Sequence, residues 1–118
     1  MKNYNSGSLK IVFNQQGGKT KMSWVGQSDD RNPSVSLNPY LDSLIEDLKG
    51  TELVVEYRNL EYMNSSTVPP IIQFLKKLNT NGIKTQIIYD ANSKWQCASF
   101  KALETLSLMM NNITVSGK

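Results

Sequence analysis

The sequence of 118 residues has no histidine and a single cysteine, Cys97. The lack of histidine excludes the Ser-His-Asp triad, the Cys-His pair, the zincin helix and every metal site with a histidine ligand. One cysteine cannot form an internal disulfide, in agreement with a reducing compartment. Only carboxylates, hydroxyls, lysines and one thiol are left for chemistry. We therefore expect a protein that is not an enzyme and holds no metal or cofactor.

Charge and long apolar runs are scarce as well. Thirteen basic and ten acidic residues leave a net charge of +3, with no run of like charge, so nothing in the charge pattern favours a nucleic-acid or membrane partner. The apolar stretches are too short to span a membrane. The first ten residues, MKNYNSGSLK, have no apolar core of signal-peptide length, and we expect a cytoplasmic protein.

The residues that are present indicate one globular domain over residues 1–118, since 39% are hydrophobic and 19% charged. Alternating apolar residues on both sides of Gly17-Gly18 predict an N-terminal β-hairpin. Asn38 followed by Pro39 is typical of a helix start, and Gly50 of a helix end. The apolar positions between them have helical spacing: Leu41, Leu44, Ile45 and Leu48.

The second half of the chain alternates strands and helices. We expect strands at residues 52–58 and 84–89, a helix at residues 68–79, and a third helix that Asn92-Ser93 can cap. The expected buried stripe of this third helix is Ala98, Ala102, Leu103, Leu106 and Met109 or Met110. The sequence NITV near the end could add an edge strand. This order predicts an α/β fold with a mixed, largely parallel sheet of four to five strands and three helices.

Loops that follow parallel strands meet at one edge of a sheet, where ligands of open α/β sheets bind. Three polar loops are expected there, at residues 26–36, 59–67 and 90–94. In the middle loop, Asn64 and three hydroxyl residues come directly before a helix. Ser66 or Thr67 can serve as its N-cap. Pro69 and Pro70 have no amide hydrogen and belong in the first turn, so a phosphate on a preceding hydroxyl could meet the amides of residues 66–68.

The strand that leads into Tyr62-Met63-Asn64-Ser65-Ser66 ahead of a helix resembles the STAS domain of bacterial anti-anti-sigma factors. In that family Met-Asp-Ser-Ser or Met-Asp-Ser-Thr is followed by Gly, and the serine after the aspartate is phosphorylated. By this motif the switch residue is Ser65, with Ser66 as the alternative. Asn64 replaces the usual aspartate and Thr67 the glycine, so the chain looks closer to a divergent STAS-like branch. The resemblance covers about residues 9–110.

The resemblance implies a non-enzymatic bacterial regulator that acts by partner switching. Its partners would be a serine/threonine protein kinase of the anti-sigma type, a metal-dependent serine phosphatase and a downstream effector protein. We expect the three loops to form the partner surface. The residues assigned to it are Asp29, Asp30, Asn64, Ser66, Thr67, Asn92 and Trp95.

Three members of this set have alternative interpretations. Ser93 as an N-cap would place Trp95 in the first helical turn, where it is either an exposed anchor for a partner or folded onto the core. The adjacent Asp29 and Asp30 could orient a hydroxyl or hold a metal ion of an incoming enzyme, or they could form a solvated turn.

Two other functions stay open at this stage. A small-ligand or nucleotide-binding module could use the same edge of the sheet. Against it, the chain has neither a G-x-G-x-x-G nor a G-K-[ST] loop, and Gly17-Gly18 lies in the expected hairpin. A purely structural subunit is the third possibility, although it would leave the polar loops unexplained.

Overall fold

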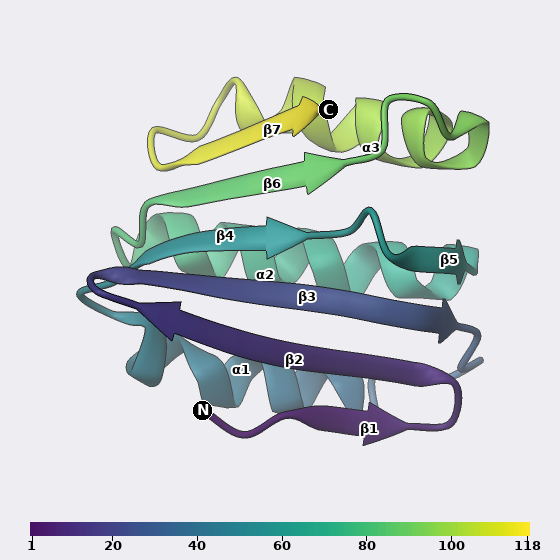
Figure 1. The fold of residues 1–118 in the computed structure, drawn as a ribbon, viewed down its shortest axis with the longest axis horizontal. Helices are drawn as coiled ribbons and strands as arrows, with labels where there is room; N and C mark the ends of the chain where they lie inside the picture. The colour runs from purple at the N-terminus through teal and green to yellow at the C-terminus, as the bar shows by residue number, and fades with distance from the viewer.

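The computed structural model describes all 118 residues. Its elements follow one another as β1 (Tyr4–Ser6), β2 (Leu9–Gln16), β3 (Lys19–Ser28), α1 (Leu37–Leu48), β4 (Glu52–Glu56), β5 (Leu60–Met63), the 3-10 turn η1 (Ser65–Thr67), α2 (Val68–Thr80), β6 (Thr85–Tyr89), α3 (Lys94–Ser107) and β7 (Ile113–Gly117). Figure 1 shows one twisted sheet with the helices behind it. The expected α/β fold with an N-terminal hairpin is confirmed.

The sheet is larger than expected, with seven strands instead of four to five. Their order is β1-β2-β3-β4-β6-β7, and β5 pairs with β3 outside this path. The strands β1, β2 and β3 are antiparallel, and every other pairing is parallel. The sequence did not indicate β1 and β5, because strands of three and four residues are too short to show an alternating pattern.

The strand β5 exists because β3 is much longer than β4. The first half of β3 pairs with β4, up to Ser23 opposite Glu56. After β4 ends, β5 pairs with the last residues of β3, from Gly26 to Ser28. The expected loop at residues 26–36 is therefore shortened to residues 29–36. The expected loop at residues 59–67 contains the strand β5 and the turn η1.

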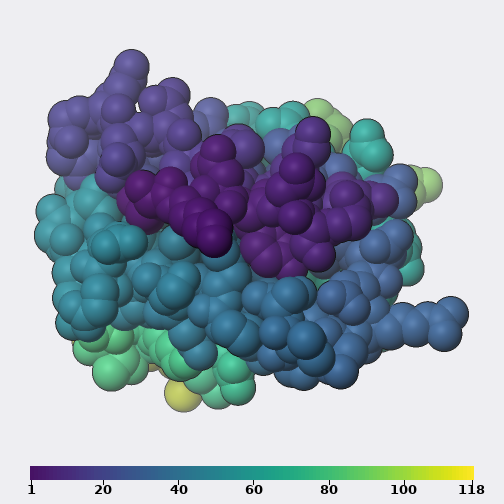
Figure 2. All heavy atoms as spheres, turned by 90° about the horizontal axis from the view of Figure 1, so that it is seen from below, coloured from purple at the N-terminus to yellow at the C-terminus, as the bar shows by residue number.

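Side chains alternate along the strands, and one set is covered by all three helices. Trp24 of β3, Tyr57 after β4 and Phe100 of α3 are fully buried and form an aromatic cluster, with ring centroids 5.1 and 4.7 Å apart. At the β1 edge, Figure 2 shows the N-terminal segment (dark purple) between the hairpin and α1. There Tyr4 packs on Tyr40 at 4.7 Å between ring centroids.

The expected start of α1 is wrong by two positions. The helix begins at Leu37, and Asn38 lies inside it. Leu37 is buried and its amide bonds the carbonyl of Pro33 at 2.8 Å, so the chain turns into the helix before Asn38. The helix α2 begins as expected, with its two prolines in the first turn.

The expected buried stripe of α3 is only partly correct: Leu103 is buried, Leu106 and Met110 are half-buried, and Ala98 and Ala102 are exposed. The buried residues are Gln96, Phe100, Leu103 and Ser107, whereas Met109 is 85% exposed. Phe100 contacts Tyr57 and Tyr89, and this aromatic packing sets the rotation of the helix. None of the helices is long and apolar enough to cross a lipid bilayer.

Candidate functional site

The strands β3, β5 and β6 all end at the same edge of the sheet, on the right in Figure 1. The segments that follow them are residues 29–36, the turn η1 with Asn64, and residues 90–93. The sequence thus correctly placed the three polar segments at one edge. Their connections to one another come from a few side chains with partners far away in the sequence.

Asn64 holds the turn that carries Ser65. Its Oδ1 accepts hydrogen bonds from the Thr67 amide at 3.1 Å and the Thr67 hydroxyl at 2.8 Å. Its Nδ2 donates to the Asp30 carbonyl at 2.9 Å, and its own amide donates to the Ser28 carbonyl at 2.9 Å. The side chain that caps the turn is therefore Asn64. Thr67 occupies the N-cap position of α2, as one of the two expected alternatives, but its side chain makes no capping bond there. Asn64 joins the turn to the segment after β3.

Thr67 acts inside the protein. It is fully buried, and its Oγ1 lies 2.7 Å from the Ser28 Oγ. Because the Thr67 hydroxyl donates to Asn64, the Ser28 hydroxyl is the donor in this second bond. We expected Thr67 to contact a partner, and this expectation is wrong. Because its side chain is fully buried, Thr67 supports the turn and does not touch a partner.

Ser65 is exposed at the start of the turn, and Ser66 is half-buried. A phosphate at this place would find fewer amide donors than the sequence suggested. The Thr67 amide is bonded to Asn64, and the Val68 amide donates to the Ser65 carbonyl. Of the three expected donors, this leaves the Ser66 amide. A phosphate on Ser65 would consequently be held mainly by water, with its charge exposed.

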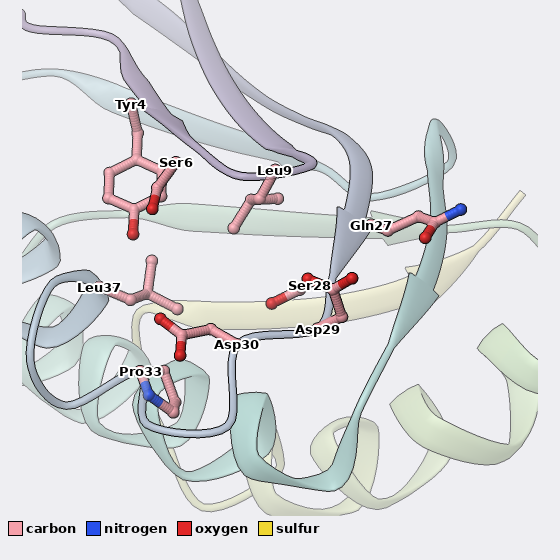
Figure 3. Close-up of a pocket in the computed structure, with 9 residues that line it drawn as sticks. All are labelled: Tyr4, Ser6, Leu9, Gln27, Ser28, Asp29, Asp30, Pro33 and Leu37. Atoms are coloured by element: carbon pink, nitrogen blue, oxygen red, sulfur yellow. The ribbon is translucent and has the colours of Figure 1, made fainter.

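Asp29 and Asp30 are exposed and lie next to this turn. The Asp30 carboxylate accepts a hydrogen bond from the Asn32 amide at 2.9 Å, which closes the loop as a local turn. In Figure 3 this carboxylate faces Leu37 and Pro33 across a cavity of about 20 Å³. Such a volume admits about one water molecule. No group of three potential metal-ligating side chains occurs in the protein.

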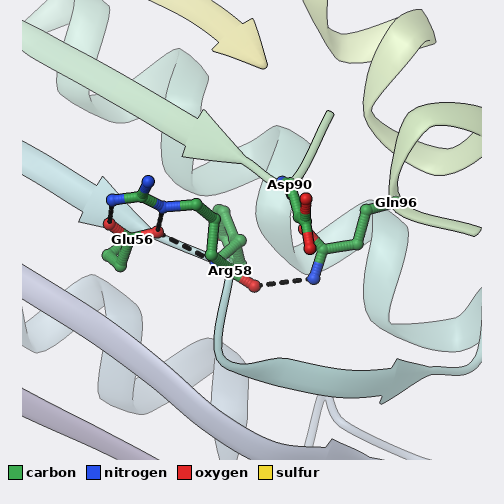
Figure 4. Close-up of polar contacts among 5 residues, drawn as sticks. Glu56, Arg58, Asp90 and Gln96 are labelled. Carbon is green, nitrogen blue, oxygen red and sulfur yellow. Dashed lines mark hydrogen bonds and ion pairs between the residues drawn. The ribbon is translucent and has the colours of Figure 1, made fainter. Parts of the chain in front are cut away.

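The third loop is held by Gln96, which the sequence analysis did not single out. The Gln96 side chain is buried, with 1% of its surface exposed. Its Oε1 accepts a hydrogen bond from the Asp90 amide at 2.7 Å. Its Nε2 donates hydrogen bonds to the carbonyls of Tyr57 and Leu60 at 2.8 and 2.9 Å. Figure 4 shows this side chain bridging the end of β6 and the turn before β5. A signal was present, because Ser93-x-x-Gln96 has capping-box spacing. Ser93 does accept from the Gln96 amide at 3.4 Å, as expected of a cap.

Trp95 and Asn92 belong to this third loop. Trp95 is half-buried, with its ring 6.5 Å from that of Phe100, so it combines a core contact with an exposed portion. Asn92 is exposed, and its amide bonds the Asp90 carboxylate at 2.8 Å. Neither is bonded to the Ser65 turn.

Two exposed apolar residues at this edge were missed by the sequence analysis. Val35, in the segment after β3, is 71% exposed, and Tyr62 of β5 is 49% exposed. Exposed aromatic side chains are enriched in protein interfaces. An edge with exposed Tyr62, Val35 and Trp95 around polar side chains has the composition of a protein contact surface.

A pair of charges lies beside the same connection. Arg58 bonds Glu56 through its Nε and its terminal nitrogen, both at 2.8 Å, and through its amide at 3.0 Å (Figure 4). Burial alone would raise the pKa of the Glu56 carboxyl, but the hydrogen bonds and charge of Arg58 outweigh it and hold this pKa below its ordinary value. Glu56 is therefore ionised at neutral pH.

No protein-family model matches the sequence, and no curated protein matches it. Solved structures with the same fold do exist. An anti-sigma factor antagonist from Mycobacterium paratuberculosis is 14% identical, with 91% of this chain and 86% of that chain covered at a TM-score of 0.63. The anti-sigma factor antagonist SpoIIAA in its unphosphorylated form is 13% identical, covering 77% of this chain and 81% of that chain at a TM-score of 0.55.

A third likeness is to an uncharacterized protein with a SpoIIAA-like fold from Shewanella loihica. It is 11% identical and covers 96% of this chain and 88% of that chain at a TM-score of 0.55. The expected STAS-like fold is thereby confirmed. At these identities the likeness concerns the fold.

Proposed function

We propose that this protein is a non-enzymatic, cytoplasmic partner-switching regulator whose state is set by phosphorylation of Ser65. The observation that carries the proposal is the exposed Ser65 hydroxyl at the end of β5, in a turn that Asn64 fastens to the neighbouring loop. The fold shared with anti-sigma factor antagonists supports it. A serine kinase of the anti-sigma type, a metal-dependent serine phosphatase and an effector protein would be its partners.

The switch acts by charge at the contact surface. Phosphate adds about −1.5 to −2 charges, beside an edge that already carries Asp29 and Asp30. Since two of the nearby amides are occupied, little in the protein compensates this charge. A partner that covers the edge would have to desolvate it. A loss of about 3 kcal/mol weakens binding by roughly a hundredfold, which is enough to release a partner.

The alternative of a small-ligand or nucleotide site at this edge has no support in the geometry. Ligand pockets enclose roughly 300–1,000 Å³, whereas the cavity beside Asp30 has about 20 Å³. A flat edge with exposed apolar side chains fits a protein partner better.

The test is mass spectrometry of the protein purified from its own host, with Ser65→Ala and Ser66→Ala variants expressed in parallel. We expect phosphate on Ser65, its loss in Ser65→Ala and its retention in Ser66→Ala. Ser66→Ala is the matched control because it removes the neighbouring hydroxyl and leaves the Asn64 bonds in place. Phosphate retained at full level in Ser65→Ala contradicts the assignment.

A further inference from the structure

One face of the sheet has no helix on it. The helices lie behind the strands in Figure 1. The residues that alternate with the buried ones along β2, β3, β4 and β6 therefore lie on the side of the sheet without helices. Parallel sheets are normally covered on both faces. Here the parallel pairs β3-β4 and β4-β6 are bare on one side. We call this side the open face.

The centre of the open face mixes apolar and polar residues. Val12, Val25, Val54 and Ile88 occupy outward positions on four neighbouring strands. The strand registers place Lys21, Ser23 and Glu56 between them. Val12 is 38% exposed and Ile88 is 8% exposed. Two shallow hollows of about 190 and 240 Å³ open on this face, and Lys19 and Val54 line both of them.

The charges around this centre are mostly positive. The basic residues on or at the rim of the open face are Lys10, Lys19, Lys21, Arg58 and Lys84. Three acidic residues accompany them, Glu52, Glu56 and Asp90. Arg58 forms an ion pair with Glu56 and lies near Asp90, so the four lysines leave an excess of positive charge. None of the four lysines is in an ion pair, since the three salt bridges of the protein involve Lys49, Arg58 and Lys77.

We propose that the open face of the sheet docks an acidic segment of a partner protein. An extended segment with alternating acidic and apolar side chains would place its carboxylates near the unpaired lysines and its apolar residues over Val12 and Val54. Such charge complementarity raises the association rate and selects the partner. Lys19 begins β3 and Lys84 directly precedes β6, so these two lysines lie at the opposite edge of the sheet from Ser65. The proposal does not depend on phosphorylation.

The composition of the face argues against other occupants. A second copy in face-to-face contact would oppose lysines to lysines, which is repulsive. Single-stranded nucleic acid binding relies on aromatic stacking, and Tyr62, beside Gln27 at the edge, is the one aromatic side chain on this side of the sheet. The other aromatic residues of the strands, Phe13 and Trp24 among them, face the helices.

The experiment is a titration of the ¹⁵N-labelled protein with a synthetic peptide of about twelve residues in which glutamate and valine alternate, in about 50 mM salt. We expect amide shifts along β2, β3 and β4 and not in the helices. Lys19→Gln/Lys21→Gln should weaken binding about tenfold, as should glutamine in place of the peptide's glutamates. The control is Lys76→Gln/Lys101→Gln, which removes two exposed lysines from α2 and α3 and should leave binding unchanged.

The contrary results are equally specific. Shifts in the helices, equal weakening by the control variant, or no shifts at a peptide concentration of about 1 mM would overturn the proposal. A heparin oligosaccharide or phosphatidylserine vesicles that bind the open face more tightly than the peptide would assign it to a polyanion or a membrane. A dimer in light scattering that Lys19→Gln/Lys21→Gln dissociates would assign it to a second copy. The amide spectrum of each free variant checks that it is folded.

Discussion

Replacing Asn64 by aspartate removes one hydrogen bond and keeps two. Aspartate caps as well as asparagine does, so its oxygen can still accept from the amide and hydroxyl of Thr67. It has no amide donor for the Asp30 carbonyl, which Asn64 bonds at 2.9 Å. The change therefore isolates the link between the Ser65 turn and the segment after β3. Asn64→Ala removes this link and the cap together.

The expected losses follow from these bonds. One hydrogen bond contributes about 0.5–1.5 kcal/mol, and the new carboxylate would face a carbonyl oxygen and the charges of Asp29 and Asp30. We expect Asn64→Asp to lower the free energy of unfolding by about 1–2 kcal/mol. Asn64→Ala loses the same link at about 0.5–1.5 kcal/mol and the cap at about 1 kcal/mol, without a new charge, so it should lose about 1.5–2.5 kcal/mol in total.

Urea unfolding followed by circular dichroism measures the free energy of unfolding of both variants. In thermal unfolding, each 1 kcal/mol lost should lower Tm by roughly 4 °C in a domain of this size. Asn111→Asp is the control, because Asn111 is exposed and the same chemical change there breaks no side-chain bond. Stability of Asn64→Asp equal to that of the wild type would refute the role given to the Asp30 link. Stability below that of Asn64→Ala would refute the role of the cap.

Three further variants test the packing around the site. Gln96→Leu leaves three backbone groups without their partner and should cost about 2–4 kcal/mol, with faster hydrogen exchange in β5. Arg58→Met should lower the free energy of unfolding at pH 7 because the buried Glu56 carboxylate loses its counter-charge. The pKa of Glu56 is lower in the folded protein than in the unfolded chain. This stabilisation is therefore present above the unfolded pKa of about 4.3 and is lost as the pH falls through the folded value. The free energy of unfolding should consequently fall less steeply with decreasing pH in Arg58→Met than in the wild type. Trp95→Ala should lower the free energy of unfolding by about 1.5–2.5 kcal/mol, roughly half the loss for a fully buried aromatic residue. It should also weaken the binding of the partner, as measured by calorimetry. A loss above about 4 kcal/mol would make Trp95 a core residue.

The parts of the fold that could be predicted are those with short-range causes. The Gly17-Gly18 turn, the two prolines that open α2 and the Ser93 cap each act within a few residues of themselves. Local backbone preferences are enough to specify such features.

The missed parts have causes far away in the chain. The strand β5 forms because β3 continues beyond β4, which no pattern within residues 60–63 reveals. The buried side of α3 depends on Phe100 meeting Tyr57 and Tyr89. Gln96 has the spacing of a local capping box, yet it bonds carbonyls 36 and 39 residues away. In each case tertiary packing overrides the local pattern.

Asn64 and Thr67 form one hydrogen-bonded unit. A glycine in place of Thr67 would supply no hydroxyl to Asn64 or Ser28, and an aspartate in place of Asn64 would supply no donor to Asp30. The turn is thus held without any charged side chain of its own. Its anchors are neutral and do not titrate near neutral pH. Under the proposed function, phosphorylation of Ser65 is then the event that changes the charge of this turn, while the bonds of Asn64 keep its backbone in place.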